Sequence, residues 1–160
     1  MIISKTIKDN SGVTLFEILI AVGIIGFMAA VSLGIYGNLL FTSQIDEGSY
    51  KAIQMMRTAK ERSVGGFNDS QHGIYLDINP AGDDRIILFQ GSSYAARDAD
   101  YDSILPLKSI FNLSTTITGN EFVFSKGFGI PNNTGSIVIT HTEGGSRTIT
   151  VNSYGLIEEN

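Results

Sequence analysis

The sequence predicts an α+β fold in which a long N-terminal helix is followed by an antiparallel β-sheet head. Three observations predict it. Residues 18–45 form a run of 28 positions without a charged side chain, in a chain of 160 residues. The next segment, to about residue 63, repeats apolar side chains at the 3-to-4 spacing of an amphipathic helix. Beyond residue 65, short runs of β-branched and aromatic residues alternate with turn clusters, which is typical of strands.

Composition excludes several classes of function. The chain carries 11 Lys and Arg against 16 Asp and Glu, a formal net charge of -5, and it has no Cys. Because no basic cluster appears, we predict no nucleic-acid surface built on phosphate contacts. The absence of Cys excludes disulfides, thiol catalysis and cysteine-ligated metals. The length allows one domain and hardly two.

The first element is an apolar segment long enough to cross a membrane. Residues 18–41 contain Ser32 and Asn38 as their only strongly polar side chains, and about 20 apolar residues span a bilayer core as a helix. A secretory signal peptide is one alternative, because Lys5 and Lys8 supply a basic start, but its apolar region runs only about 7–15 residues. A plain signal anchor with its basic side in the cytoplasm is another.

Glu17 lies at the edge of this apolar segment, where an ionised carboxylate in lipid is costly without a partner. We expect it to pair with a positive N-terminus on a neighbouring copy, which predicts lateral packing of such helices. Gly26, Ala30 and Gly34 fit this expectation, since they are spaced by four and share one helical face. Small residues in that pattern allow close approach of helices in a membrane.

Residues 11–22, SGVTLFEILIAV, closely resemble the prepilin cleavage and methylation motif of type IV pilins and type II secretion pseudopilins. The resemblance implies a pilin-like fold and removal of the leader, residues 1–12, by a prepilin peptidase between Gly12 and Val13. It also implies N-methylation of Val13, retention of residues 13–41 as a transmembrane and filament-core helix, and contact of Glu17 with the amino terminus of an adjacent subunit. The implied partners are other pilins or pseudopilins, the prepilin peptidase, and an assembly platform protein with its ATPase in the inner (cytoplasmic) membrane.

The chain departs from the family pattern in two respects. The first mature residue is usually Phe, whereas here it is Val13. Many major pilins carry a Pro about two-thirds of the way along the apolar stretch, where this chain has Gly34 and Gly37. Because glycine lowers helix stability by about 1 kcal/mol relative to Ala, we expect the helix to loosen there when it is packed in a filament.

The second half of the helix, residues 42–64, is predicted to be amphipathic and to lie on a sheet. Its predicted apolar face comprises Ile45, Ala52, Ile53, Met56 and Ala59. Gly65 and Gly66 are the expected stop signal. The remaining residues, 65–160, form the β-rich head, with strands expected at Gly73–Ile78, Arg85–Gln90, Leu105–Ile110, Leu113–Thr118, Glu121–Ser125, Ser136–Thr142 and Arg147–Asn152.

The turns of the head are predicted from their composition. The segments 79–84 and 143–146 are expected to be hairpin connections. The closing pattern of strand, glycine turn, hairpin and final glycine, from Phe122 to Ile157, is similar to the last strands of H-type minor pseudopilins and FimT-like minor pilins. This second resemblance favours a minor subunit.

No residue set in the head predicts catalysis. Asp98, Asp100 and Asp102 alternate in the sequence, and clustered carboxylates suit Ca²⁺, but the spacing of an EF-hand loop is absent. We interpret them as a solvated acidic loop, with a cation site as the alternative. His72 and His141 stand far apart, without a spaced set of Asp, Glu or Cys. We therefore predict no enzyme activity, no cofactor and no resident metal.

These expectations describe a structural subunit, a minor pilin or pseudopilin of a type IV pilus or a type II secretion pseudopilus. It would pass once through the cytoplasmic membrane, with its head outside the cytoplasm, and then enter a filament. One alternative is a major pilin. The other is a signal-anchored membrane enzyme or sensor with a β-rich extracytoplasmic domain.

Overall fold

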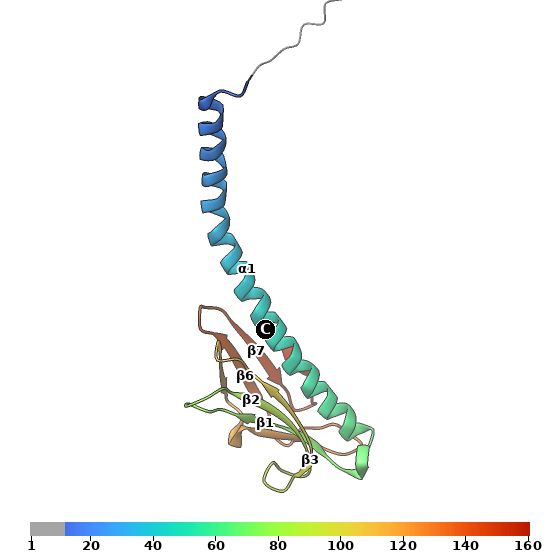
Figure 1. Cartoon of the computed structure of the whole chain (residues 1–160). Helices are drawn as coiled ribbons and strands as arrows, with labels where there is room; N and C mark the ends of the chain where they lie inside the picture. The colour runs from blue at the N-terminus through green and yellow to red at the C-terminus, as the bar shows by residue number, and fades with distance from the viewer. Residues whose placement is uncertain (1–11) are drawn as a thin grey trace, which may run out of the picture. The chain divides into compact units, whose positions relative to one another are not determined.

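The computed structural model describes residues 12–160, with the side chains at 32–36 and 38 left out. The fold is α+β with antiparallel sheets (Figure 1). In chain order, the elements are α1 (Leu15–Val64), η1 (Phe67–Asp69), β1 (His72–Asp77), β2 (Arg85–Gln90), β3 (Asp98–Pro106), β4 (Phe111–Thr115), η2 (Thr118–Asn120), β5 (Glu121–Phe124), β6 (Gly135–His141), β7 (Ser146–Val151) and β8 (Ile157–Glu159).

Contacts divide the chain into two compact units, the first ending at Leu39 and the second running from Leu40 to Asn160. Among the residues whose placement is described, no helix is both long and apolar enough to cross a membrane. The predicted spanning segment, residues 13–41, includes the six positions whose side chains are not described. Residues 1–11 of the predicted leader also lie outside the described residues.

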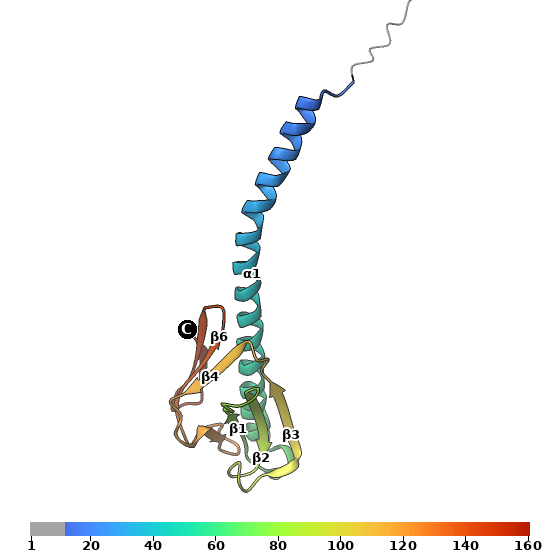
Figure 2. The same cartoon turned by 60° about the vertical axis from the view of Figure 1, so that its left-hand side comes forward.

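The second unit contains two four-stranded antiparallel sheets, where the sequence predicted one. Sheet A has the strand order β3-β2-β1-β5, and sheet B has the order β4-β6-β7-β8. Figure 2 shows β4 and β6 to the left of β1, β2 and β3. The chain changes sheet between β3 and β4, returns to sheet A for β5, and completes sheet B with β6, β7 and β8.

The residues of α1 within the second unit pack against both sheets. The face predicted to be apolar is the buried one, which confirms the amphipathic assignment: Ile45, Ala52, Ile53, Met56 and Ala59 are at most 5% exposed. They join one core with side chains of sheet A, such as Ile86, and of sheet B, such as Ile149. Since each side chain buried on this face removes apolar surface from water, the helix and the two sheets stabilise one another.

Two strand predictions were wrong. We expected an acidic loop at 98–102 and a strand at 105–110, but β3 runs from Asp98 to Pro106. It pairs with β2 across an irregularity between Leu88 and Gln90. The final strand, β8, was missed altogether. It is only three residues long and is defined by its pairing with β7, and so short a segment carries no periodicity of its own.

Candidate functional site

The start of α1 carries a capping box. The hydroxyl of Thr14 accepts the backbone N–H of Glu17 at 3.2 Å, and the Glu17 carboxylate accepts the Thr14 N–H at 3.0 Å. The Thr14 hydroxyl also donates to the same carboxylate oxygen at 3.2 Å. The first four N–H groups of a helix have no intrahelical partners, and this reciprocal arrangement provides acceptors for two donors at the helix start, those of Thr14 and Glu17.

Glu17 therefore has a local role that the sequence analysis did not give it. The pattern Thr-x-x-Glu before an apolar run is a sequence signature of a capping box, and it was present at residues 14–17. A carboxylate in the first turn is further stabilised by the helix dipole. The interaction with a neighbouring amino terminus stays a prediction, and it now competes with an intramolecular partner.

The bond predicted to be cut lies just outside this capping box. Gly12 and Val13 are exposed and non-helical, and a Cβ built on Gly12 would meet nothing within 4 Å. The peptide between them is thus reachable from outside, two residues before α1 begins. Since Thr14 and Glu17 both follow this bond, cleavage there would leave the capping box in the product.

The first half of α1 exposes large apolar side chains around its whole circumference. Every described side chain from Val13 to Val31 is exposed. The exposed residues include Leu15, Phe16, Ile18, Leu19, Ile20, Val22, Ile24, Ile25, Phe27, Met28 and Val31. A helix that is apolar on all sides is normally buried in a large core or in a membrane.

The small residues of the predicted packing stripe lie on this exposed helix. A Cβ built on Gly26 would meet nothing within 4 Å, and Ala30 is exposed. Gly34, the third member, falls among the positions whose side chains are not described. The backbone of α1 is helical through Gly34 and Gly37. The expected loosening concerns a packed filament and stays a prediction.

The three aspartates of the candidate cation site lie on β3 and not on a loop. The backbone N–H of Asp100 donates to Asp98 at 3.2 Å. Asp102 pairs with Arg97 at 2.8 Å, and this hydrogen bond raises the pKa of the Arg97 guanidinium. Arg97 also lies 3.8 Å from the centroid of the Tyr94 ring. Within residues 12–160, no group of three His, Cys, Asp or Glu is placed to hold a metal ion.

Both histidines are buried and serve the fold. His141 accepts the Glu143 N–H at Nδ1, so its Nε2–H donates to the Gln44 amide oxygen at 3.1 Å. His72 is fully buried, and neither ring nitrogen has a hydrogen-bond partner in the described structure. Burial is the main cause that lowers the pKa of His72, and the nearby Arg62 cation lowers it further.

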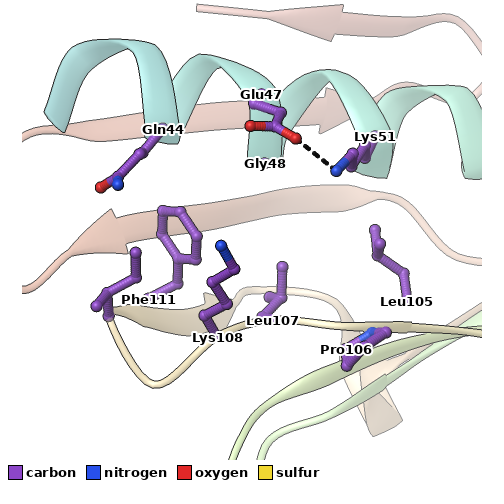
Figure 3. A pocket seen from close by; sticks show the side chains of 10 residues that line it. Gln44, Glu47, Gly48, Lys51, Leu105, Pro106, Leu107, Lys108 and Phe111 are labelled. Atoms are coloured by element: carbon purple, nitrogen blue, oxygen red, sulfur yellow. Dashed lines mark hydrogen bonds and ion pairs between the residues drawn. The ribbon is translucent and has the colours of Figure 1, made fainter. Parts of the chain in front are cut away.

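A narrow apolar pocket, hereafter the slot, lies between α1 and the connection from β3 to β4 (Figure 3). Its volume is about 90 Å³, and its lining residues are Gln44, Glu47, Gly48, Lys51, Leu105, Pro106, Leu107, Lys108, Ile110 and Phe111. On the helix side, Glu47 pairs with Lys51 at 2.6 Å, which lowers the pKa of the Glu47 carboxyl. The slot contains apolar surface and charged groups at its rim, but no nucleophile paired with a base.

No family model, curated protein or solved structure matches this chain.

Proposed function

We propose that this chain is a structural subunit of a type IV pilus or of a type II secretion pseudopilus. In this proposal, a prepilin peptidase removes residues 1–12, residues 13–41 hold the subunit in the cytoplasmic membrane, and the same helix later packs laterally in a filament. The β-rich head stays outside the cytoplasm. The resemblance of its closing strands favours a minor subunit.

The observation that carries the proposal is the exposure of apolar side chains around the first half of α1. A single chain leaves Leu15 83% exposed and Phe27 72% exposed, together with the apolar residues between them. Each buried CH₂ group is worth about 0.8 kcal/mol, so such a helix is stable only against lipid or against other helices. A pilin helix requires both environments in turn, lipid before assembly and neighbouring helices in the filament.

In the proposed assembly step, Glu17 would exchange its intramolecular partner for the amino terminus of a neighbour. Cleavage after Gly12 would create a positive amino group on Val13, next to Thr14, whose backbone N–H already lies 3.0 Å from the Glu17 carboxylate. In a single subunit, this carboxylate has its own amino terminus within reach. In a filament, the same group would neutralise the amino terminus of a neighbour, because an unpaired charge among packed apolar helices is costly.

Mass spectrometry of the mature N-terminus tests the class of protein. We expect a chain that begins at Val13, and Gly12→Lys should leave the leader attached and keep the subunit out of sheared filaments. A chain that begins at Met1, or after Ala30, would contradict the proposal. The first outcome would favour a signal-anchored protein, and the second would favour a secretory signal peptide.

A matched pair of variants separates the two roles of Glu17. Thr14→Ala removes the capping hydroxyl and should cost about 1 kcal/mol of helix stability, whereas Glu17→Gln removes the charge and keeps an acceptor. If Glu17 acts on a neighbour, Glu17→Gln should reduce the filament fraction at least tenfold and Thr14→Ala less than twofold. Equal losses, with both variants still cleaved, would assign Glu17 to capping alone.

A further inference from the structure

Within the described residues, the two sheets have four edge strands, β3 and β5 in sheet A and β4 and β8 in sheet B. An edge strand presents a row of backbone N–H and C=O groups, and proteins normally cover or shorten such edges because they pair readily with other chains. β3 is nine residues long and differs from the other three edges in this respect.

The other edges are closed by the chain itself or are very short. On β5, the Val123 N–H donates to the Asn132 side-chain oxygen at 2.8 Å, and the Val123 carbonyl accepts the Asn132 N–H at 3.0 Å. On β4, the Leu113 N–H donates to the buried Asp84 carboxylate at 2.7 Å. β8 has only three residues. The edge of sheet A at β3 therefore stands out as the one available for pairing.

The direction of the free groups on β3 follows from one hydrogen bond. The Leu107 N–H donates to the Asp84 carbonyl at 2.8 Å, in the register that continues the pairing of β2 with β3. Because hydrogen-bonded pairs alternate along an antiparallel ladder, the backbone groups of Leu105 and Ser103 face β2, and those of Ile104 face away from it. Figure 2 shows β3 as the outermost strand on this side of sheet A.

The free part of this edge is short and has defined ends. Pro106, at one end, has no N–H to donate. At the other end, the Asp100 N–H already donates to the Asp98 side chain at 3.2 Å. The free edge thus runs from Asp102 to Pro106, which is about 17 Å at 3.3 Å per residue.

A groove of about 460 Å³ lies along this edge, between β3 and α1. Its helix side extends from Tyr50 to Arg62, and its strand side includes Ser103 and Leu105. The helix rises about 18 Å over those residues, which matches the length of the free edge. A strand added beside β3 would point every second side chain toward α1, and the groove offers the space for them.

We propose that an extended segment of a different protein adds to sheet A as a strand beside β3, with alternate side chains in the groove. Main-chain hydrogen bonds to an exposed sheet edge favour an extended chain, and the pockets beside the edge determine which side chains fit. Lys51 lines the groove but is paired with Glu47, so uncharged side chains fit along most of its length. Arg62, which forms no ion pair within the described residues, lines one end, and a carboxylate fits there.

A second copy of this chain fits this edge less well. Its own free edge is the same β3, and antiparallel pairing of two such edges would turn the α1 helices in opposite directions, which copies held in one membrane cannot do. Parallel pairing would turn the outer face of the second β3 into the groove, and with it the charged pair of Asp102 and Arg97. The inference rests on the proposed function for its setting, in which a minor subunit has other proteins as neighbours.

Site-specific photo-cross-linking of the full-length protein in cell membranes tests this pairing. The photoreactive residue p-benzoylphenylalanine replaces Ser103, whose side chain lines the groove. Irradiation should attach one other protein, and mass spectrometry should map the attachment to an extended segment with a carboxylate nearby. Ile104→Pro removes an outward N–H and keeps the hydrogen bonds to β2, so it should reduce the adduct at least threefold. Ile104→Thr keeps the N–H and should leave the adduct in place.

A second pair of variants tests the groove without altering the backbone of β3. Gln54→Trp, at an exposed position in the groove, should fill it and reduce the adduct at least threefold, whereas Arg57→Trp, exposed on the same helix but outside the groove, should not. The inference would be overturned by the absence of an adduct, by adducts between copies of this chain alone, or by equal losses in the two Trp variants. Attachment to a helix of the partner would also reject it.

The mature N-terminus is measured in the same cells. A start at Val13 without an adduct would leave the proposed function standing and reject only the pairing at β3. A start at Met1 with an adduct that Gln54→Trp reduces would reject the proposed function and support the pairing.

Discussion

At the scale of single residues, His72 has fewer compensating contacts than any other buried ionisable group of the described residues. Its backbone N–H donates to the Ser63 hydroxyl at 2.8 Å, but its ring is covered by the Phe67 ring, with centroids 5.8 Å apart, and both ring nitrogens lack hydrogen-bond partners. Burial and the Arg62 cation lower its pKa, while the polar groups of Gln90 and the Ser70 backbone oppose the shift. The neutral form is therefore the folded form.

This predicts a loss of stability in acid. The unfolded chain binds a proton at His72 near pH 6.5, whereas the folded chain binds it only at lower pH. The contribution of His72 to stability is therefore intact above about pH 6.5 and declines as the pH falls from there toward the lowered folded pKa. His72→Leu, which cannot bind a proton, should flatten this decline in the urea midpoint between pH 7.5 and 5.5. An unchanged pH dependence in the variant would assign the acid sensitivity to other groups.

At the scale of elements, a polar network fixes α1 to sheet B. Ser49, only 1% exposed, donates to the Glu159 carboxylate of β8 at 2.8 Å. Arg147 of β7 pairs with Asp46 of α1 at 2.6 Å and approaches Glu159 at 3.6 Å. The helix is thus connected to the last two strands by hydrogen bonds that cross about a hundred residues of sequence. This network also explains how a strand as short as β8 keeps its place.

We predict unequal costs for two substitutions within one turn of α1. Ser49→Ala removes a buried donor to a carboxylate and should lower the free energy of unfolding by about 1 to 2 kcal/mol. Lys51→Ala removes an exposed ion pair with Glu47 and should cost less than about 0.5 kcal/mol. Equilibrium urea unfolding of both variants measures the difference. If the two costs were equal, the Ser49 hydrogen bond would contribute no more than a surface ion pair.

The elements also show what the sequence predicts and what it leaves open. The periodicity of α1 and its glycine stop were confirmed to within one residue, and β2 was predicted with its observed bounds, because both signals are local. The assignment of β3 was wrong, since its Asp-rich first half becomes a strand only by pairing with β2 and by the contact of Arg97 with Asp102. The division into two sheets likewise depends on pairing between distant segments.

The candidate site was predictable to the same extent. The motif predicts roles for Glu17 and the Gly12–Val13 bond, and the capping role of Thr14 was predictable from its spacing to Glu17. The slot and the groove beside β3 were not predictable, because each is assembled from segments far apart in the sequence. Gly48 meets the β3–β4 connection only after the strands have paired, and Thr58 shares the groove with Leu105 only when α1 packs on sheet A.

At the scale of the whole molecule, the two units have different roles: the second holds the buried core, and the first presents exposed apolar side chains. The core of the second unit uses no side chain before Ile45 among the described residues. Upstream of it, Phe41 and Gln44 contact the buried His141, with ring centroids of Phe41 and His141 5.2 Å apart. In the first unit, the described side chains from Val13 to Val31 are exposed. Folding of the head should therefore be independent of residues before Leu40.

Truncation tests this independence. A chain that starts at Leu40 should fold cooperatively and stay in solution without detergent, because it keeps every core residue and loses the exposed apolar helix. Ile45→Ala in that chain should cost about 2 to 5 kcal/mol. A chain that starts at Glu47 should lose more, since it also lacks Phe41, Gln44 and the Asp46 partner of Arg147. Urea unfolding followed by far-UV circular dichroism ranks the three chains. A Leu40 chain without a cooperative transition would show instead that the head needs the first half of α1 to fold.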